Sequence, residues 1–370
     1  MASSLFTPIP LRGLTLDNRV VVSPMCQYSA VDGNATDWHL MHLGQLSVSG
    51  SGLLIVEATA VEARGRITPR CLGLYSDENE AAVARVVGFC REHGNAKLGI
   101  QLAHAGRKAS SHTPADGRHP LAEGEGAWET VAPSPIPSSS RRAAPRMLDD
   151  AGLMGTIDAF VHAARRAERL GFDLIELHMA HGYLLHEFLS PLSNQRDDAY
   201  GGSIENRMRF PLQVFDAVRE VWPGDKPLGV RISASDWVDG GWDIVDSVTL
   251  AEALKVHGCD YVCASSGGVS GEQQITLGPG YQVPFADAIK RRTGIPTMAV
   301  GMILEPQHAE ALIADGQADM IALARGMLYN PRWAWHAAEV LGASAAYPVQ
   351  YERSRPAEWP EAFAALKAAE

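Results

Sequence analysis

Short runs of Val, Ile and Leu alternate with amphipathic stretches along most of the chain. Each apolar run has a length typical of a strand that is buried on both faces. The predicted strands cover residues 20–24, 53–60, 97–102, 172–177, 228–232, 261–264, 297–300 and 320–323. The predicted helices between them include residues 80–93, 155–170, 205–221 and 305–314. Glycines such as Gly94, Gly171, Gly258 and Gly316 suit the C-terminal ends of helices.

Eight strands, each followed by a helix, predict an α/β protein with one (β/α)8 TIM-barrel domain over residues 1–370. A doubly wound open sheet is the alternative. It fits less well because no Gly-x-Gly-x-x-Gly motif follows the first strand. Residues 1–19 precede that strand, and we expect them to form a short hairpin or plug at the bottom of the barrel.

One long segment departs from the repeat. Residues 109–150 follow the third strand, are rich in Pro and Ser, and include the run VAPSPIPSSSRRAAP. Such a segment could be a structureless linker, but long loops inside compact domains are usually lids or binding loops. We therefore expect an insertion that caps the mouth of the barrel.

Charge and cysteine content exclude several classes of protein. A net charge of -11 argues against nucleic acid and anionic membrane surfaces as partners. The five cysteines are too scattered for a disulfide framework, an iron–sulfur cluster or a zinc site. The first residues, MASSLFTPIPLRG, contain no apolar signal core, and no apolar run is long enough to span a bilayer. We expect a soluble, cytoplasmic protein.

Polar residues follow the predicted strands at their C-terminal ends, where barrels of this kind form active sites. The fourth strand leads into His178, His181 and Tyr183. Two imidazoles and a phenol suit chemistry on a carbonyl-bearing substrate, because they can stabilise negative charge on oxygen and deliver a proton. The two histidines could instead bind a metal ion, with His186 or Glu187 as a third ligand.

The last strands carry a possible phosphate site. Gly301 and Arg325 follow the seventh and eighth strands, where barrels often bind phosphate. Glycine lets backbone N–H groups approach an anion, and arginine supplies a fork of donors.

Motifs along the whole chain resemble those of the Old Yellow Enzyme family of flavin-dependent ene-reductases. They are SPMCQYS, QLAHAGRKA, HMAHGYLLHEFLSPLSNQRDDAYGGSIENR, VRIS and LARGMLYNP, in the family's order and spacing. Cys26 and Tyr28 together with His178 and His181 resemble the branch of xenobiotic reductases and thermophilic-like ene-reductases. The resemblance implies tightly bound, non-covalent FMN and NADPH or NADH as the hydride donor. It also implies ping-pong reduction of C=C bonds that are activated by carbonyl or nitro groups.

The resemblance also implies roles for single residues. His178 and His181 would hold the substrate carbonyl oxygen, Tyr183 would protonate the α-carbon, and Tyr28 would line the substrate pocket. Cys26 would tune the redox potential of the flavin. The residues implied to contact FMN are Ser23, Pro24, Met25, Cys26, Ala58, Gln101, His178, Arg231, Gly267, Gly301, Ala324 and Arg325.

A tail at residues 345–370 contains a Gln-Tyr-Glu-Arg run that ends at Arg353. By resemblance, this arginine enters the substrate pocket of a neighbouring subunit, which implies a homodimer or homotetramer. Two other functions stay open. One is a metal-dependent barrel hydrolase that uses His178 and His181 as ligands, and the other is a flavin-binding protein without catalytic activity.

Overall fold

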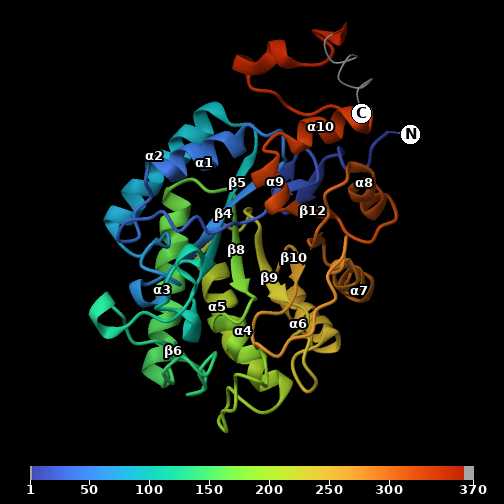
Figure 1. The fold of residues 1–370 in the computed structure, drawn as a ribbon. Helices are drawn as coiled ribbons and strands as arrows, with labels where there is room; N and C mark the ends of the chain where they lie inside the picture. The colour runs from blue at the N-terminus through green and yellow to red at the C-terminus, as the bar shows by residue number, and fades with distance from the viewer. Residues whose placement is uncertain (1, 362–370) are drawn as a thin grey trace.

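The computed structural model describes residues 2–361, and its centre is a closed barrel of eight parallel strands (Figure 1). The barrel order is β10-β11-β12-β3-β4-β5-β8-β9. The strands are β3 (Val20–Val22), β4 (Leu53–Ala60), β5 (Lys97–Ala103), β8 (Leu174–Met179), β9 (Leu228–Ser233), β10 (Val262–Ser265), β11 (Thr297–Ala299) and β12 (Met320–Leu323). The predicted TIM barrel is confirmed.

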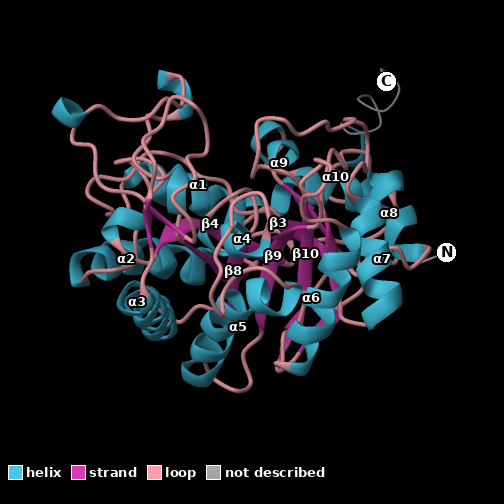
Figure 2. Ribbon diagram, turned by 90° about the horizontal axis from the view of Figure 1, so that it is seen from below, coloured by secondary structure: helices cyan, strands magenta, loops and turns pink. Residues whose placement is uncertain are grey.

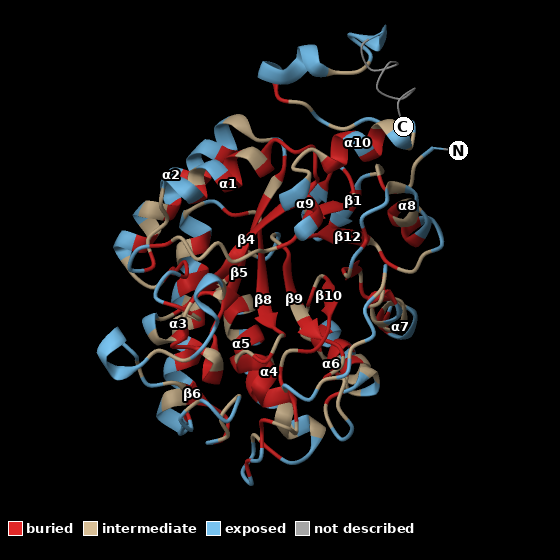
Figure 3. Ribbon diagram, viewed as in Figure 1, coloured by how far each residue is buried: buried red, intermediate tan, exposed pale blue. Residues whose placement is uncertain are grey.

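Helices surround the strands on the outside, so the strands are almost completely buried (Figures 2 and 3). The helices are α1 (Asp37–Ser47), α2 (Asp77–His93), α3 (Asp150–Arg169), α4 (Leu184–Leu189), α5 (Ile204–Val221), α6 (Ile244–Val256), α7 (Val283–Thr293), α8 (Pro306–Ala314), α9 (Arg325–Tyr329) and α10 (Trp333–Val340). No helix within residues 2–361 is both long enough and apolar enough to cross a membrane.

Side chains alternate between two apolar clusters, as expected for strands with a period of two. In β8, Ile175, Leu177 and Met179 belong to the large cluster between strands and helices. Leu174 belongs to the smaller cluster inside the barrel. Glu176 and His178 share the parity of Leu174 and therefore face the barrel interior. A strand whose sequence is mostly apolar thus places polar side chains in the interior of the barrel.

The N-terminal hairpin is confirmed. Strands β1 (Ile9–Leu11) and β2 (Leu14–Leu16) pair antiparallel, and their leucines join the cluster inside the barrel. The Gly13 N–H donates to Asp225 O at 2.9 Å, and the Arg12 guanidinium donates to the Asp260 carboxylate. Both acceptors precede barrel strands, so the hairpin closes the N-terminal end of the barrel.

Several predicted boundaries differ from the structure, and two of the differences are informative. The strand predicted at residues 172–177 lies two residues later, so His178 is part of β8 and pairs in register with Arg231 of β9. Helix α3 begins at Asp150, before the predicted residue 155, because the Asp149 side chain caps it by accepting the Gly152 N–H.

The segment predicted as an insertion, residues 109–150, does separate β5 from α3. It contains the one-turn helices η3 (Pro114–Asp116) and η4 (Glu123–Glu125) and a two-stranded parallel sheet of β6 (Val131–Ala132) and β7 (Arg146–Met147). Arg107 Nη1 donates to Ile136 O at 3.2 Å, and Trp128 Nε1 donates to Arg64 O at 2.9 Å. These contacts fix the segment to the loops that follow β4 and β5.

Candidate active site

His178, His181 and Tyr183 meet at the C-terminal end of β8. The ring centroids of His178 and His181 lie 5.1 Å apart, and those of His178 and Tyr183 lie 4.9 Å apart, both edge to face. The turn that joins them is unusual, because His181 has φ 60° and the following Gly182 has φ 70°. A left-handed histidine costs energy that the surrounding contacts must supply, and such residues concentrate at functional sites.

The protonation states of this cluster suit hydrogen-bond donation and proton delivery. Burial and the nearby Arg231 charge hold the pKa values of His178 and His181 well below the usual range, so both rings are neutral. The Ala180 N–H donates to His178 Nδ1 at 3.2 Å, which leaves the ring proton on Nε2. Burial raises the pKa of Tyr183 well above its ordinary value, so the phenol keeps its proton.

Ser265 and Lys108 complete this cluster, although sequence reasoning gave neither a role there. Ser265 Oγ lies 2.8 Å from His181 Nε2, so Nδ1 is the nitrogen that remains for a ligand. Lys108 Nζ donates to His181 O at 2.8 Å and also to Gly268 O. Burial lowers the pKa of Lys108 to about 8. This lysine therefore supports the turn from within the protein.

Arg231 lies beside the cluster on the interior face of β9. Its Nη1 donates to Ser23 Oγ at 2.7 Å, while its buried Nε has no hydrogen-bond partner within residues 2–361. In β5 and β8, Gln101 donates to Glu176 Oε1 at 2.7 Å, and burial raises the pKa of Glu176. Glu176 was missed in the sequence analysis, although a carboxyl group within the run LIELHM was the available signal.

Cys26 lies in the loop after β3, within the electrostatic influence of a carboxylate from an irregular position in β4. The β4–β5 register shifts between Val56 and Ala58, which leaves Glu57 unpaired. Glu57 accepts the Gln27 N–H at 3.1 Å and lies 3.4 Å from His39 Nε2. Burial, and next the Glu57 charge, raise the pKa of Cys26 well above its ordinary value. Cys26 is therefore a neutral thiol, which suits a tuning role better than nucleophilic attack.

The remaining predicted residues lie around the same end of the barrel, with one exception. Pro24, Met25 and Tyr28 follow β3, Ala58 lies in β4, and Gly267, Gly301 and Ala324 follow β10, β11 and β12. Gly301 has φ 116°, and the Arg325 side chain forms no hydrogen bond or ion pair with the residues that the structure describes. The exception is Arg353, which lies in the exposed two-turn 3-10 helix η5 (Val349–Ser354) and lines an open cavity with Glu352 and Trp359.

The metal-binding alternative lacks a ligand set. Within residues 2–361, no group of three or more His, Cys, Asp and Glu side chains is arranged to hold a metal ion. His186, a candidate third ligand, faces Asp236 at 3.0 Å, and Glu187 accepts the Arg107 N–H at 2.9 Å.

A barrel with neutral donors, a phenol and an unpaired arginine at the ends of its strands is typical of enzymes that bind an anionic cofactor there. Residues 4–343 match the model of the NADH:flavin oxidoreductase / NADH oxidase family, and the chain belongs to this family, which includes the Old Yellow Enzymes. The NADPH dehydrogenase of Geobacillus sp. (strain WCH70) is 48% identical over 355 residues, which cover 95% of this chain and 99% of that protein. The chain is thus related to NAD(P)H-dependent flavin oxidoreductases.

Solved structures agree with this relationship. Morphinone reductase has a TM-score of 0.77 and 29% sequence identity, covering 94% of this chain and 92% of its own. Its complex with tetrahydroNAD has a TM-score of 0.75 and 28% identity, covering 93% of this chain and 92% of the other.

The residues present fit FMN, the cofactor that the family implies. The buried Arg231 Nε has no partner, and a guanidinium there suits the electron-rich edge of a flavin ring. Gln101 is held by Glu176 in an orientation that leaves its carbonyl oxygen as an acceptor. The glycine at position 301 and the unpaired Arg325 suit a phosphate group.

Proposed function

We propose that this enzyme is an ene-reductase, which uses NADPH or NADH to reduce C=C bonds activated by a carbonyl or nitro group. The observation that carries the proposal is the cluster of two neutral imidazoles and a protonated phenol, in which the His178 ring lies 5.1 Å from that of His181 and 4.9 Å from that of Tyr183. An activated alkene needs hydrogen-bond donors for its oxygen and one proton for its α-carbon, and the cluster offers both.

The chain's own residues bind and orient the alkene. His178 Nε2 donates to the substrate oxygen, and His181 approaches the same oxygen through Nδ1. Losing one such donor typically raises a barrier by roughly 2.7–4 kcal/mol. Tyr183 holds the proton that the α-carbon receives, and Tyr28 lines the same pocket. Tightly bound FMN supplies the hydride transfer chemistry.

We also propose the cofactor contacts that the family resemblance implies for residues at this end of the barrel. Ser23, Pro24, Met25, Cys26, Ala58, Gln101, His178 and Arg231 would contact the flavin ring. Gly267, Gly301, Ala324 and Arg325 would contact its phosphate end. We further propose that residues 109–150 cap the mouth of the barrel. We also propose that Arg353 completes the pocket of a neighbouring subunit in a homodimer or homotetramer.

NAD(P)H and the alkene would use one pocket in turn, which predicts ping-pong kinetics. The test is an anaerobic absorbance experiment on the purified protein, with NADPH added first and cyclohexenone second. A flavin band that bleaches and then returns would support the proposal. Bleaching without return would mean a different electron acceptor, and no flavin band after reconstitution with FMN would refute the proposal.

A further inference from the structure

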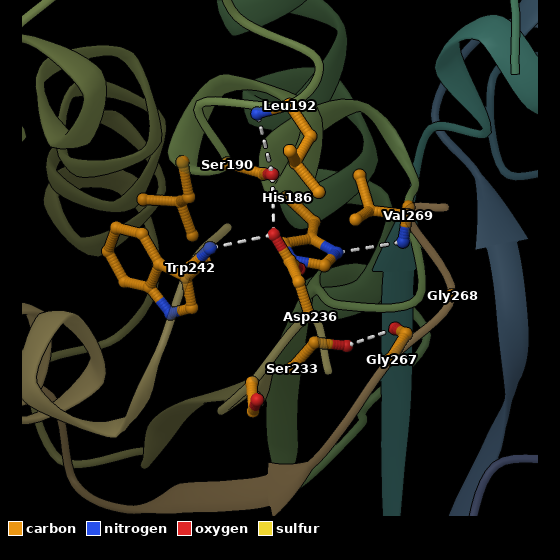
Figure 4. A network of polar contacts seen from close by, with 12 residues as sticks. His186, Ser190, Leu192, Ser233, Asp236, Trp242, Gly267, Gly268 and Val269 are labelled. Atoms are coloured by element: carbon orange, nitrogen blue, oxygen red, sulfur yellow. Dashed lines mark hydrogen bonds and ion pairs between the residues drawn. The ribbon is translucent and has the colours of Figure 1, made fainter. Parts of the chain in front are cut away.

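A buried histidine–aspartate pair lies behind the turn that carries His181 and Tyr183. His186 in α4 and Asp236 in the loop after β9 are both completely buried, and His186 Nε2 lies 3.0 Å from Asp236 Oδ1 (Figure 4). Asp236 Oδ2 accepts the Ser190 hydroxyl at 2.6 Å and the Trp242 N–H at 2.8 Å. Burial alone would raise the pKa of Asp236, but these neighbours hold it below its usual value.

The other ring nitrogen of His186 contacts the catalytic turn directly. The Gly182 N–H donates to His186 Nδ1 at 2.8 Å. Nδ1 must therefore be unprotonated, so the ring proton resides on Nε2, the nitrogen that lies 3.0 Å from Asp236 Oδ1. The carboxylate consequently favours the one neutral tautomer that can accept the Gly182 N–H.

Gly182 lies between His181 and Tyr183, the two residues of this turn that are proposed to act on the substrate. Its φ of 70° follows the φ of 60° at His181, and a Cβ atom at Gly182 would lie 2.3 Å from Gly268 O. Buried side chains hold the polar backbone atoms of this turn. Ser233 Oγ accepts the His181 N–H at 2.9 Å, Lys108 donates to His181 O, and His186 accepts the Gly182 N–H. Ser233 in turn donates to Gly267 O (Figure 4).

We propose that His186 and Asp236 are positioning residues for the reduction of the alkene. Asp236 fixes the tautomer of His186, His186 holds the Gly182 N–H, and this contact sets the directions of the His181 and Tyr183 side chains. The inference rests on the proposed function for its consequence in catalysis, and on the structure alone for the tautomer and the turn.

Asp236→Asn should reverse the tautomer with almost no change in shape. Since two donors meet at Oδ2, the asparagine keeps its oxygen there and turns its NH2 group toward His186 Nε2. His186 must then carry its proton on Nδ1, where it faces the Gly182 N–H donor to donor. The double variant His186→Asn/Asp236→Asn restores an acceptor, because asparagine Oδ1 replaces Nδ1 in geometry. Asp243→Asn is the matched control, since asparagine also serves as the N-cap of α6.

The experiment measures flavin content, anaerobic flavin reduction by NADPH and flavin reoxidation by cyclohexenone, together with histidine ¹⁵N NMR spectra. We expect Asp236→Asn to slow reoxidation roughly tenfold to a hundredfold, as a small misplacement of catalytic groups does. Flavin content and reduction by NADPH should stay near wild type. The His186 signal, assigned by its loss in the double variant, should change from Nε2- to Nδ1-protonated. The double variant should recover most of the rate, and Asp243→Asn should match wild type.

Three results would overturn the inference: wild-type His186 protonated on Nδ1, unchanged reoxidation in Asp236→Asn, or a double variant no faster than Asp236→Asn. The last result would mean that the pair only stabilises the fold. If wild type does not reduce cyclohexenone, the proposed function fails, and the spectra decide the inference. A Gly182 amide signal that shifts in Asp236→Asn and returns in the double variant then supports it, and an unchanged signal overturns it.

Discussion

The pKa of the Tyr183 phenol lies well above its ordinary value, and this determines which role the residue takes in proton transfer. Because burial keeps the phenol protonated, its effect must come from being held near the carbon that needs a proton. We expect Tyr183→Phe to slow reoxidation of the flavin by cyclohexenone by about 10²–10⁴-fold, since the proton donor is lost. Stopped-flow absorbance should show reduction by NADPH nearly unchanged. An equal loss in both half-reactions would exclude Tyr183 as the donor.

Cys26 offers a second test at a single residue. Its thiol is neutral and lies beside the buried Glu57 carboxylate, so it can influence a nearby flavin only by polarity and hydrogen bonding. We expect Cys26→Ser to retain FMN and to shift its midpoint potential, because a hydroxyl is a stronger hydrogen-bond donor than a thiol. Spectroelectrochemical titration measures the shift, and an unchanged potential would remove this role.

The sequence reveals some of these residues and hides others for a physical reason. His178, His181 and Tyr183 lie within six residues of one another, so their spacing after a strand predicts the cluster. Ser265 and Lys108 join it from 84 and 73 residues away from His181. No local pattern encodes contacts over such separations, and they become visible only once the barrel is closed.

Helix α4 and the one-turn helix η2 (Gly106–Lys108) are joined by one buried carboxyl group. Glu187 Oε1 accepts the Arg107 N–H at 2.9 Å, while Oε2 has no partner within residues 2–361. Burial raises the pKa of Glu187 to about 8 from an ordinary value of 4.5. The folded protein therefore binds the Glu187 proton more tightly than the unfolded chain does.

This pKa shift predicts how stability depends on pH. Below 4.5 the carboxyl is protonated in both states, and between 4.5 and about 8 only the unfolded chain ionises. The Glu187 contribution to the free energy of unfolding therefore falls as pH rises through this window, and it is constant above it. We expect Glu187→Gln to flatten this part of the profile in urea unfolding. Parallel profiles for variant and wild type would contradict the shift.

Predicted boundaries of helices and strands were wrong where a few local hydrogen bonds determine at which residue the element begins. Strand β8 begins two residues late because Gly171 takes φ 80° and the Phe172 N–H still bonds back to Ala167 O in the last turn of α3. Apolar residues such as Phe172 extend past the paired part of a strand, so hydrophobicity alone cannot locate its ends.

At the scale of the whole molecule, the segment around η5 bears on how subunits assemble. Tyr351 in η5 contacts Trp335 and Arg332 of the same chain, whereas Arg353 and Trp359 face an open cavity. If Arg353 completes a neighbouring pocket, Arg353→Ala should raise the KM for cyclohexenone while flavin content stays constant. Steady-state kinetics and analytical ultracentrifugation test this, with Arg353→Lys as the control that retains the charge. Unaltered kinetics and oligomeric state would argue against the role.

The overall architecture was the most predictable level, because eight apolar runs with helices between them leave few alternatives. The interior of the barrel was not predictable in the same way. Glu57 enters the site through a register shift in β4, and Gly229 must lack a side chain because a Cβ atom there would lie 2.1 Å from the Tyr261 ring. Both depend on neighbouring strands rather than on local sequence.

The pairing of β3 with β12 has a consequence for how the chain folds during its synthesis. The first barrel strand binds the last one, and the hairpin before it bonds to Asp225 and Asp260, far along the chain. A nascent chain therefore keeps two unpaired strand edges until residue 323 has left the ribosome. Exposed edges invite pairing with other chains. Synthesis of the final third should thus be the period when this protein depends most on molecular chaperones.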